Sequence, residues 1–540
     1  MGERSPPPAG RRTRLVSSLV LGQRACEVAL DPERGALEWT EQPQPRGGRE
    51  SCAVPISEII AVEETEIDKK QCNSGKWQKM AKPHAFTASR PKHLLVYINP
   101  YGGKKQGEKI YEQKVAPLFS LASISTDVIV TERANHARDN LLEVNLEKYD
   151  GVVCVGGDGM FNEVMHGLIG RTQKDSGIDQ NNPKAPLVQC NIRIGIIPAG
   201  STDCVCYSTV GINDPVTSAL HIIVGDTQPL DVSSVHHHDT LLKYFVSLLG
   251  YGFYGDILKD SEGKRWMGPV RYDLSGFKTF LSHHYYEGTI SLLPASHAVG
   301  SPRDKKHCRS GCHICKQSKQ RLEIEQKKNG GEIKGDDEGE WKVIRGKFLA
   351  INIANISCAC PRSPKGLAPA AHLADGSSDL ILVRKCSRFN FLRYLIRHTN
   401  RDDQKLARGE SWPDFHCGMK LTFPSKNQAA KGVTGHTWPC TAAFDFSFVE
   451  VYRIKKFQFT SKHLEDGDCD AKKMQKNRFG HFCRDHPACC CIPPSSTWNC
   501  DGETLDCSTI EVTVHCQLMK LFARGIERNS TLEAVQRQLC

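Results

Sequence analysis

One pattern constrains the fold of this chain more than any other: an apolar run of strand length that ends in glycines. It is clearest at residues 152–155, which lead into a Gly-Gly-Asp-Gly run at 156–159 and then into a helical pattern. Glycines at the end of a buried strand let the backbone approach a ligand and direct N–H groups at it. The helix start that follows adds a partial positive charge, so the loop suits a phosphate. A tight turn capped by Asp158 fits the same residues, and both interpretations stay open at this point.

The pattern occurs twice more. Residues 93–99 form an apolar run that leads into Gly102 and Gly103, and residues 192–197 form another that leads into Gly200. Helical patterns separate these runs, and a further strand is predicted at 125–131. Strands that alternate with helices indicate a parallel sheet in a three-layer α/β domain. Because ligands bind beyond the carboxyl ends of such strands, the three glycine loops are predicted to meet at one edge of the sheet.

Phosphoryl transfer is the chemistry that these loops fit best. It depends on N–H donors, cations, carboxylates and one base, all held in position. Asp158 could orient a metal or water, or accept a proton from an attacking hydroxyl. No loop fits G-x-x-x-x-G-K-[ST], which excludes a P-loop enzyme, and none fits G-x-G-x-x-G, which disfavours the usual dinucleotide fold.

After residue 235 the helical pattern fades and strand-like runs dominate. We expect an all-β second domain, a β-sandwich, over residues 236–540. Three long segments interrupt it, and loops of that length are functional or disordered more often than structural. The predicted strands are 244–250, 288–293, 347–353, 379–384, 444–454 and 510–515, and the interrupting loops are 297–340, 401–443 and 461–500.

The N-terminal part is divided at residue 50. Residues 1–50 are rich in Pro, Gly and Arg and are expected to be mostly without order, apart from the first strands of a small β region. Residues 51–89 are expected to hold the remainder of this region, with strand-like runs at 52–56, 59–62 and 85–87. The α/β domain is then predicted to span residues 90–235.

Charge and cysteine content limit the class of protein. The net charge is +10, which favours acidic partners, but a few solvated basic loops explain so small an excess, and no nucleic-acid partner is expected. No run reaches the length of a membrane-spanning helix, and the N-terminus does not read as a signal peptide. The 24 cysteines are therefore expected to be reduced, buried or metal-bound in a chain that works inside the cell.

Two further segments have a distinctive pattern. Cys308, Cys312 and Cys315 follow a C-x-x-x-C-x-x-C spacing, and with a fourth ligand they could bind zinc. A reduced Cys-rich loop is the alternative, because the usual two-pair zinc spacing is missing. The fourth ligand would come from His313, Cys358 or Cys360.

Residues 391–398 are basic and amphipathic, which fits calmodulin or membrane binding, or a core helix with snorkelling arginines.

Taken in order, these motifs resemble the diacylglycerol kinase-type lipid kinase superfamily, which includes the sphingosine kinases, and they are most similar to the ceramide kinase family. The resemblance runs from about residue 90 to the end, with interruptions, over 95–103, 131–137, 155–163, 198–204, 248–256 and 499–503. It implies transfer of the γ-phosphate of ATP, with Mg²⁺, to the primary hydroxyl of ceramide. The alternatives are a related kinase that acts on sphingosine, diacylglycerol or NAD, and a non-catalytic lipid-binding or scaffold protein.

The resemblance also implies roles for individual residues. Asp158 would accept the proton of the lipid hydroxyl, and Asp256 would face the lipid headgroup. The lipid would also lie beside Gly156, Gly157 and Gly159. The residues implied to surround the nucleotide are Asn99, Pro100, Tyr101, Gly102, Gly103, Thr131, Glu132, Arg133, Ala134, Asn135, Glu163, Gly200, Ser201, Thr202, Arg265, Arg271, Asp501, Gly502 and Glu503. A solvated basic face is the alternative for the two arginines, and a hairpin turn for Asp501-Gly502.

Partners and location follow from the same resemblance. It implies a peripheral protein of the cytoplasm and of intracellular membranes, Golgi and plasma membrane, with calmodulin at residues 391–404.

The chain departs from the family pattern in two places. The N-terminal pleckstrin-homology-like region looks truncated between Phe86 and Arg90, which predicts weaker membrane binding, and residues 405–443 look like an insertion.

Overall fold

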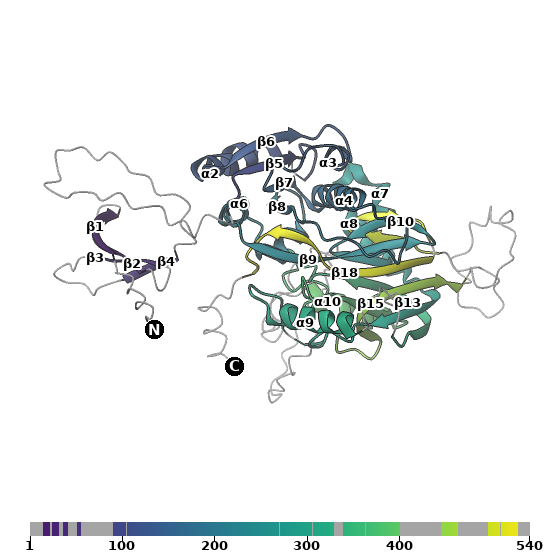
Figure 1. Cartoon of the computed structure of the whole chain (residues 1–540). Helices are drawn as coiled ribbons and strands as arrows, with labels where there is room; N and C mark the ends of the chain where they lie inside the picture. The colour runs from purple at the N-terminus through teal and green to yellow at the C-terminus, as the bar shows by residue number, and fades with distance from the viewer. Residues whose placement is uncertain are drawn as a thin grey trace, which may run out of the picture.

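The structure is a computed structural model, and it describes most of the chain beyond residue 90 (Figure 1). The described ranges are 90–399, 444–462 and 495–526, without 329–338 and the single positions 104, 269, 305, 362 and 508, together with four N-terminal strands. The predicted strands at 59–62 and 85–87 lie outside these ranges. So do the segment 405–443 and most of 461–500.

The α/β part is built on four parallel strands in the order β6-β5-β7-β8. Their alternating side chains build two separate apolar clusters, one on each face of the sheet, as the three-layer prediction requires. One cluster packs against α3 and α4 and the other against α2 and α6. The strands are β5 (His93–Ile98), β6 (Ser125–Val130), β7 (Gly151–Gly156) and β8 (Arg193–Pro198). The helices are α1 (Gly107–Ile110), the π-helical η2 (Tyr111–Val115), α2 (Ala116–Leu121), α3 (His136–Leu141), α4 (Asp158–Asp175), α5 (Cys204–Val210) and α6 (Pro215–Val224).

The second part is a β-sandwich whose two layers share long strands. The first half of β13 pairs with β12 and its second half with β14, while β15 changes partner between the same two strands. Apolar residues from both layers fill the space between them. The strands are β9 (Thr227–His237), β10 (Thr240–Phe245), β11 (Leu248–Gly252), β12 (Tyr286–Pro294), β13 (Lys342–Ala354), β14 (Ser378–Arg384), β15 (Val449–Ser461), β16 (Trp498–Cys500), β17 (Glu503–Leu505) and β18 (Thr509–Phe522).

The expectation that this second part is all-β is wrong. It contains α7 (Phe253–Glu262), the 3₁₀ turn η3 (Arg265–Met267), α8 (Val270–Ser282), α9 (His313–Lys328) and α10 (Arg388–Thr399). Helix α9 lies inside the segment 297–340 that was expected to be a loop. Its described part buries few apolar side chains, and its sequence has little hydrophobic periodicity, which is the signal that predicts a helix. Its Lys, Glu and Gln residues nevertheless favour helix.

The α/β part and the sandwich share one continuous sheet. Strand β18 pairs in parallel with β8 and antiparallel with β9, so both parts hydrogen-bond to the same strand. Figure 1 shows β18, in yellow, between the parallel strands at one end and helices α9 and α10 at the other. The boundary predicted between residues 235 and 236 falls within β9.

The N-terminal strands form an antiparallel sheet in the order β1-β2-β3-β4. They are β1 (Leu15–Leu21), β2 (Arg24–Asp31), β3 (Ala36–Glu41) and β4 (Ser51–Pro55), and β4 matches the predicted strand at 52–56. Strands β1, β2 and β3 lie within residues 1–50, where we expected the first strands of this region. In the described part of the chain, no helix is long and apolar enough to cross a membrane.

Candidate active site

The three glycine loops meet at the carboxyl edge of the parallel strands, as predicted. A Cβ atom on Gly200 would lie 2.5 Å from the Cα of Gly157, and one on Gly103 would lie 2.5 Å from the carbonyl oxygen of Ala199. Any side chain at these positions would force the loops apart, so glycine is required for the backbones to approach so closely. The result is a close packing of the three loops beside the N-terminus of α4.

Asn99 shapes the first of these loops. Its Oδ1 accepts hydrogen bonds from the backbone N–H groups of Tyr101 (2.9 Å) and Gly102 (3.0 Å), while the Tyr101 ring stays exposed. Its own N–H donates to the carbonyl oxygen of Val155 (3.0 Å), which ties the loop to β7. Directly after β6, the hydroxyl of the buried Thr131 donates to the carbonyl oxygen of Ile98 (3.2 Å). These contacts hold the ends of β5, β6 and β7 together.

Asp158 lies in the first turn of α4 and faces the start of a second helix. Its Oδ2 accepts from the N–H of Cys204 (3.0 Å) and its Oδ1 from the N–H of Val205 (2.9 Å), both in the first turn of α5. Burial raises the pKa of Asp158 above its ordinary value, although these two donors oppose the shift. The carboxylate is therefore held in one orientation and is more basic than a solvated one.

A second carboxylate, Asp203, lies beside it in the third loop. Its Oδ1 accepts from the N–H of Gly200 (2.9 Å), and its backbone is left-handed with φ of +51°. Burial and, after it, the negative charge of Asp158 raise the pKa of Asp203 to about 7. No role was predicted for Asp203, although it stands in the predicted loop next to Thr202.

Asp501 returns from the far end of the chain to this edge. Its carboxylate accepts from the backbone N–H groups of Val246 (2.9 Å) and Leu248 (2.7 Å) and from the hydroxyl of Ser247 (2.6 Å). Burial, first, and to a smaller extent the negative charge of Asp501 raise the pKa of Asp158. Asp501 and Gly502 form the turn between β16 and β17, which confirms the hairpin-turn interpretation, while the role at the nucleotide stays a prediction.

Glu503 and Glu163 occupy one side of this region. Glu503 pairs with the nearly buried Lys243. Glu163, on α4, accepts from the backbone N–H groups of Asn135 and Ala137, and burial raises its pKa. Its Oε2 is buried and has no hydrogen-bond partner among the described residues. One acceptor of Glu163 is therefore free for a ligand.

Residues that sequence analysis did not place here connect the two halves of the site. The thiol of Cys204 shares a hydrogen bond with Cys358, whose Sγ donates to the carbonyl oxygen of Ser247 (3.3 Å). The N–H of Ala359 donates to the hydroxyl of Ser208 on α5 (3.1 Å). Thus Cys358, which we considered as a metal ligand, instead packs between α5 and the backbone that holds Asp501.

Asp256, Arg265 and Arg271, expected near the lipid and the phosphates, lie farther along the chain, on α7, η3 and α8. Asp256, in the first turn of α7, accepts from the hydroxyls of Tyr286 and Ser496. Arg271 hydrogen-bonds to the adjacent Tyr272 (2.7 Å) and, in the described part of the chain, to no residue of the glycine loops. The side chain of Arg265 lies outside the described atoms. The remaining loop residues form local contacts, such as Glu132 N–H to His136 and Arg133 to Asp139.

The cysteine motif forms a compact group, with a partner that we did not predict. Ligand atoms of Cys308, Cys312, Cys315 and His372 all lie within 4.8 Å of one another. None of the three fourth ligands proposed from the sequence, His313, Cys358 and Cys360, belongs to this group.

The segment 391–398 is a core helix, which was one of its interpretations. Phe391 and Tyr394 of α10 are fully buried, and Phe391 packs edge-on against Phe253 of α7 (centroids 4.9 Å apart). Arg393 and Arg397 extend over the ring of Phe446. Residues 400–404 lie outside the described ranges.

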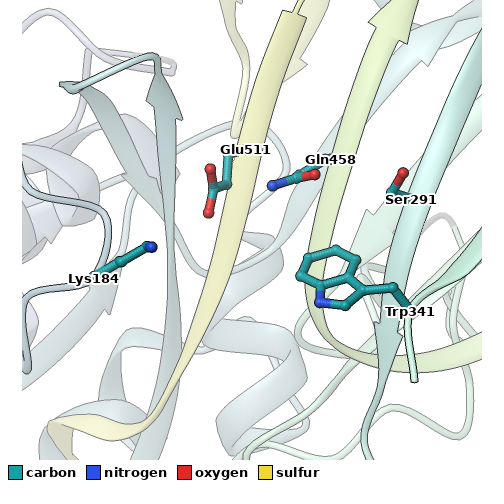
Figure 2. A pocket seen from close by; sticks show the side chains of 5 residues that line it. All are labelled: Lys184, Ser291, Trp341, Gln458 and Glu511. Atoms are coloured by element: carbon teal, nitrogen blue, oxygen red, sulfur yellow. The ribbon is translucent and has the colours of Figure 1, made fainter. Parts of the chain in front are cut away.

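A hollow of about 530 Å³ on the sandwich does not coincide with the glycine loops. Figure 2 shows its lining side chains, which extend from β12, β15, β18 and the segments beside them: Lys184, Ser291, Trp341, Gln458 and Glu511. No residue predicted for the active site lines it.

Known families match three consecutive parts of the chain. Residues 15–93 match the ceramide kinase PH domain, residues 93–235 the diacylglycerol kinase catalytic domain, and residues 245–406 the ceramide kinase C-terminal domain. The human ceramide kinase is 58% identical over 560 residues, which cover 95% of this chain and 97% of the human protein. The mouse ceramide kinase is 55% identical over 96% of this chain and 98% of its own length. The rice ceramide kinase is 30% identical over 81% of this chain and 78% of its own length. Over nearly its whole length, the chain thus belongs to the ceramide kinase family.

Proposed function

We propose that the three glycine loops bind the phosphates of ATP and that Asp158 is the base that activates ceramide. The chain is an ATP-dependent lipid kinase, as its catalytic domain and its family establish. In the proposed step the primary hydroxyl oxygen of ceramide bonds to the γ-phosphorus, and the bond from that phosphorus to the β–γ bridging oxygen breaks. The hydroxyl proton passes to Asp158, and ceramide 1-phosphate and ADP leave.

The position of Asp158 carries this proposal. It stands where the three glycine loops meet, and two donors from α5 fix its carboxylate. Burial makes this carboxylate a stronger proton acceptor, while the surrounding N–H groups suit the charged phosphates. The proposed base, Asp158, is thus next to the proposed phosphate site.

Mg²⁺ is the divalent ion that we propose for this site. Asp203 and Asp158 are hard oxygen donors beside the proposed phosphates, and the pKa of Asp203 is raised to about 7 partly by repulsion from Asp158. A cation would relieve that repulsion, so the residues fit it. When bound, Mg²⁺ would neutralise charge on the phosphates, and Glu163 would offer its free Oε2 to a hydroxyl of the nucleotide.

The lipid is proposed to approach over α7 and α8. Asp256 on α7 would bind the polar headgroup, and α8 packs against α7. Large apolar side chains of α8 are exposed at a spacing of three or four residues, which places them on one face of that helix: Val270, Leu274, Phe277 and Leu281. Trp266 on the preceding η3 is exposed as well. An exposed apolar face next to the headgroup carboxylate supports this entry route.

One experiment tests the assignment of the reaction and its base. Purified full-length protein is incubated with labelled ATP and, separately, with ceramide, sphingosine or diacylglycerol. Ceramide is expected to be phosphorylated fastest, and Asp158→Asn to lower kcat by about 10²–10⁴ because an amide cannot accept the proton. Equal turnover by the two proteins would remove Asp158 from the mechanism. Absence of turnover on every lipid would favour the scaffold alternative.

We also propose peripheral binding to phosphoinositide-containing membranes, at the Golgi and plasma membrane, through the region that matches a PH domain. The shortened region predicts weaker binding than a complete PH domain provides. Sedimentation of the full-length protein with liposomes, with and without phosphoinositide, tests this. Strong phosphoinositide-dependent binding would contradict the weakening, and a protein that lacks residues 15–89 serves as the control.

Calmodulin binding at residues 391–404 is a further proposal, supported by the basic residues of α10. Because Phe391 and Tyr394 are buried, this helix must leave the core before calmodulin can enclose it. Titration of calmodulin into the folded full-length protein, with calcium and then with chelator, measures this. Tight binding without any loss of folded structure would contradict the required release.

A further inference from the structure

Four side chains from two separate segments meet beside α9. Cys308 and Cys312 lie in the turn before this helix, Cys315 lies in its first turn, and His372 comes from the connection between β13 and β14. The Sγ atoms of Cys308 and Cys315 are 3.8 Å apart, and the Sγ of Cys312 is 3.4 Å from Nδ1 of His372. We propose that these four residues bind one zinc ion that holds the two segments together.

Two of the six distances between the ligand atoms fit a tetrahedral zinc site, and all six are within 4.8 Å. Zinc lies about 2.3 Å from thiolate sulfur and about 2.0 Å from imidazole nitrogen, so two sulfurs should be about 3.8 Å apart and sulfur and nitrogen about 3.6 Å. The observed 3.8 Å and 3.4 Å match these values before any ion is considered. A disulfide between two of the cysteines would leave the third thiol and the imidazole without a role.

Burial and ligand chemistry point the same way. His372 is 1% exposed and Cys315 is 7% exposed, so the group is largely closed to solvent, as structural zinc sites are. Three thiolates with one imidazole are soft ligands that select zinc over Mg²⁺ or Ca²⁺, which prefer oxygen. The site therefore differs in chemistry from the carboxylate-rich edge that we assign to the reaction.

The segments that the ion would join also support the active site. Near its start, the connection from β13 to β14 contacts α5, where the N–H of Ala359 donates to the hydroxyl of Ser208. Farther along it contacts β9, where the N–H of Asp231 donates to the carbonyl oxygen of Leu373 (2.7 Å), next to His372. Because α5 donates the two hydrogen bonds that orient Asp158, a zinc ion at this connection would stabilise the geometry of the base from a distance.

Metal content of the full-length protein tests the proposal without any substrate. Wild type purified without chelator is expected to contain about one zinc per chain by inductively coupled plasma mass spectrometry. Cys312→Ser and His372→Ala are expected to lose most of it. His372→Cys, which offers four thiolates, should keep it, and so should Cys386→Ser, a control cysteine outside the group. Cobalt substituted into wild type should show thiolate-to-cobalt absorption that Cys312→Ser lacks.

Folded wild type without bound zinc would overturn the proposal, even if every variant failed to fold. Cys312→Ser and His372→Ala with unchanged zinc content would overturn it as well. The result does not depend on the proposed reaction, because metal content is read in the absence of ATP and lipid. A chain that binds zinc but does not phosphorylate ceramide would refute only the active-site proposal.

Discussion

At the scale of single residues, the site depends on carboxylates kept close together. Asp158 and Asp203 lie in the second and third glycine loops, Asp501 lies in the turn between β16 and β17, and each is held by backbone N–H donors. Such donors stabilise negative charge, while burial and mutual repulsion destabilise it. The balance leaves Asp158 and Asp203 with raised pKa values, which suits a base and a cation ligand that work together.

Asp203 makes the stability of the fold depend on pH. Its pKa is about 7 in the folded protein, above the value near 4 of an unfolded chain, so the folded state binds the proton more tightly. As pH rises from about 4 to about 7, Asp203 should therefore lower the free energy of unfolding, on the order of 1–3 kcal/mol. Urea unfolding at several pH values, compared with Asp203→Asn, measures this, and the variant should show a flatter profile. An identical slope in both proteins would contradict the assignment.

At the scale of elements, the glycine loops act as one unit because their backbones touch. Gly200→Ala would place a Cβ 2.5 Å from Gly157, so the loops must separate. We expect kcat/KM for ATP to fall by about 10²-fold, since displacement of this size misplaces reacting groups. Gly263→Ala is the matched control, because nothing lies within 4 Å of its Cβ and its φ is −66°. Equal activity of both variants would show that nucleotide binding does not need the close contact between these loops.

Helix α10 offers a test of its role in the core. Phe391 is fully buried, whereas Phe389 on the same helix is 69% exposed. Phe391→Ala should lower the free energy of unfolding by about 3–5 kcal/mol, because it leaves a cavity. Phe389→Ala should change it by less than about 0.5 kcal/mol. Chemical denaturation distinguishes the two, and similar values for both variants would show that α10 does not stabilise the core.

At the scale of the whole molecule, β18 makes the two halves interdependent. It adds a parallel strand beside β8 and contributes Leu518, Met519 and Leu521 to the core of the α/β part. Near its start the same strand pairs with β15 in the sandwich. The edge that carries the glycine loops is thus held between parts of the chain that are far apart in sequence.

An isolated fragment of residues 90–235 should therefore not fold stably. It would expose the edge of β8 and the apolar residues that β18 covers. Circular dichroism and thermal unfolding of this fragment should show no cooperative transition, whereas the full chain should unfold cooperatively. A fragment that melts as sharply as the full chain would mean that β18 is dispensable.

The sequence by itself determined the local part of this protein. The alternation of apolar runs, glycine loops and helices predicted the parallel sheet and the meeting of its loops around Asp158, because these depend on short-range periodicity and on backbone freedom at glycine. It missed α9, whose polar sequence has almost no hydrophobic period. Only the tertiary structure decided that His372 joins the cysteines, that Cys358 packs on Cys204, and that Asp501 binds the backbone at 246–248. Those contacts join residues far apart in the chain, and their position follows from the path of the long, shared strands rather than from any local pattern.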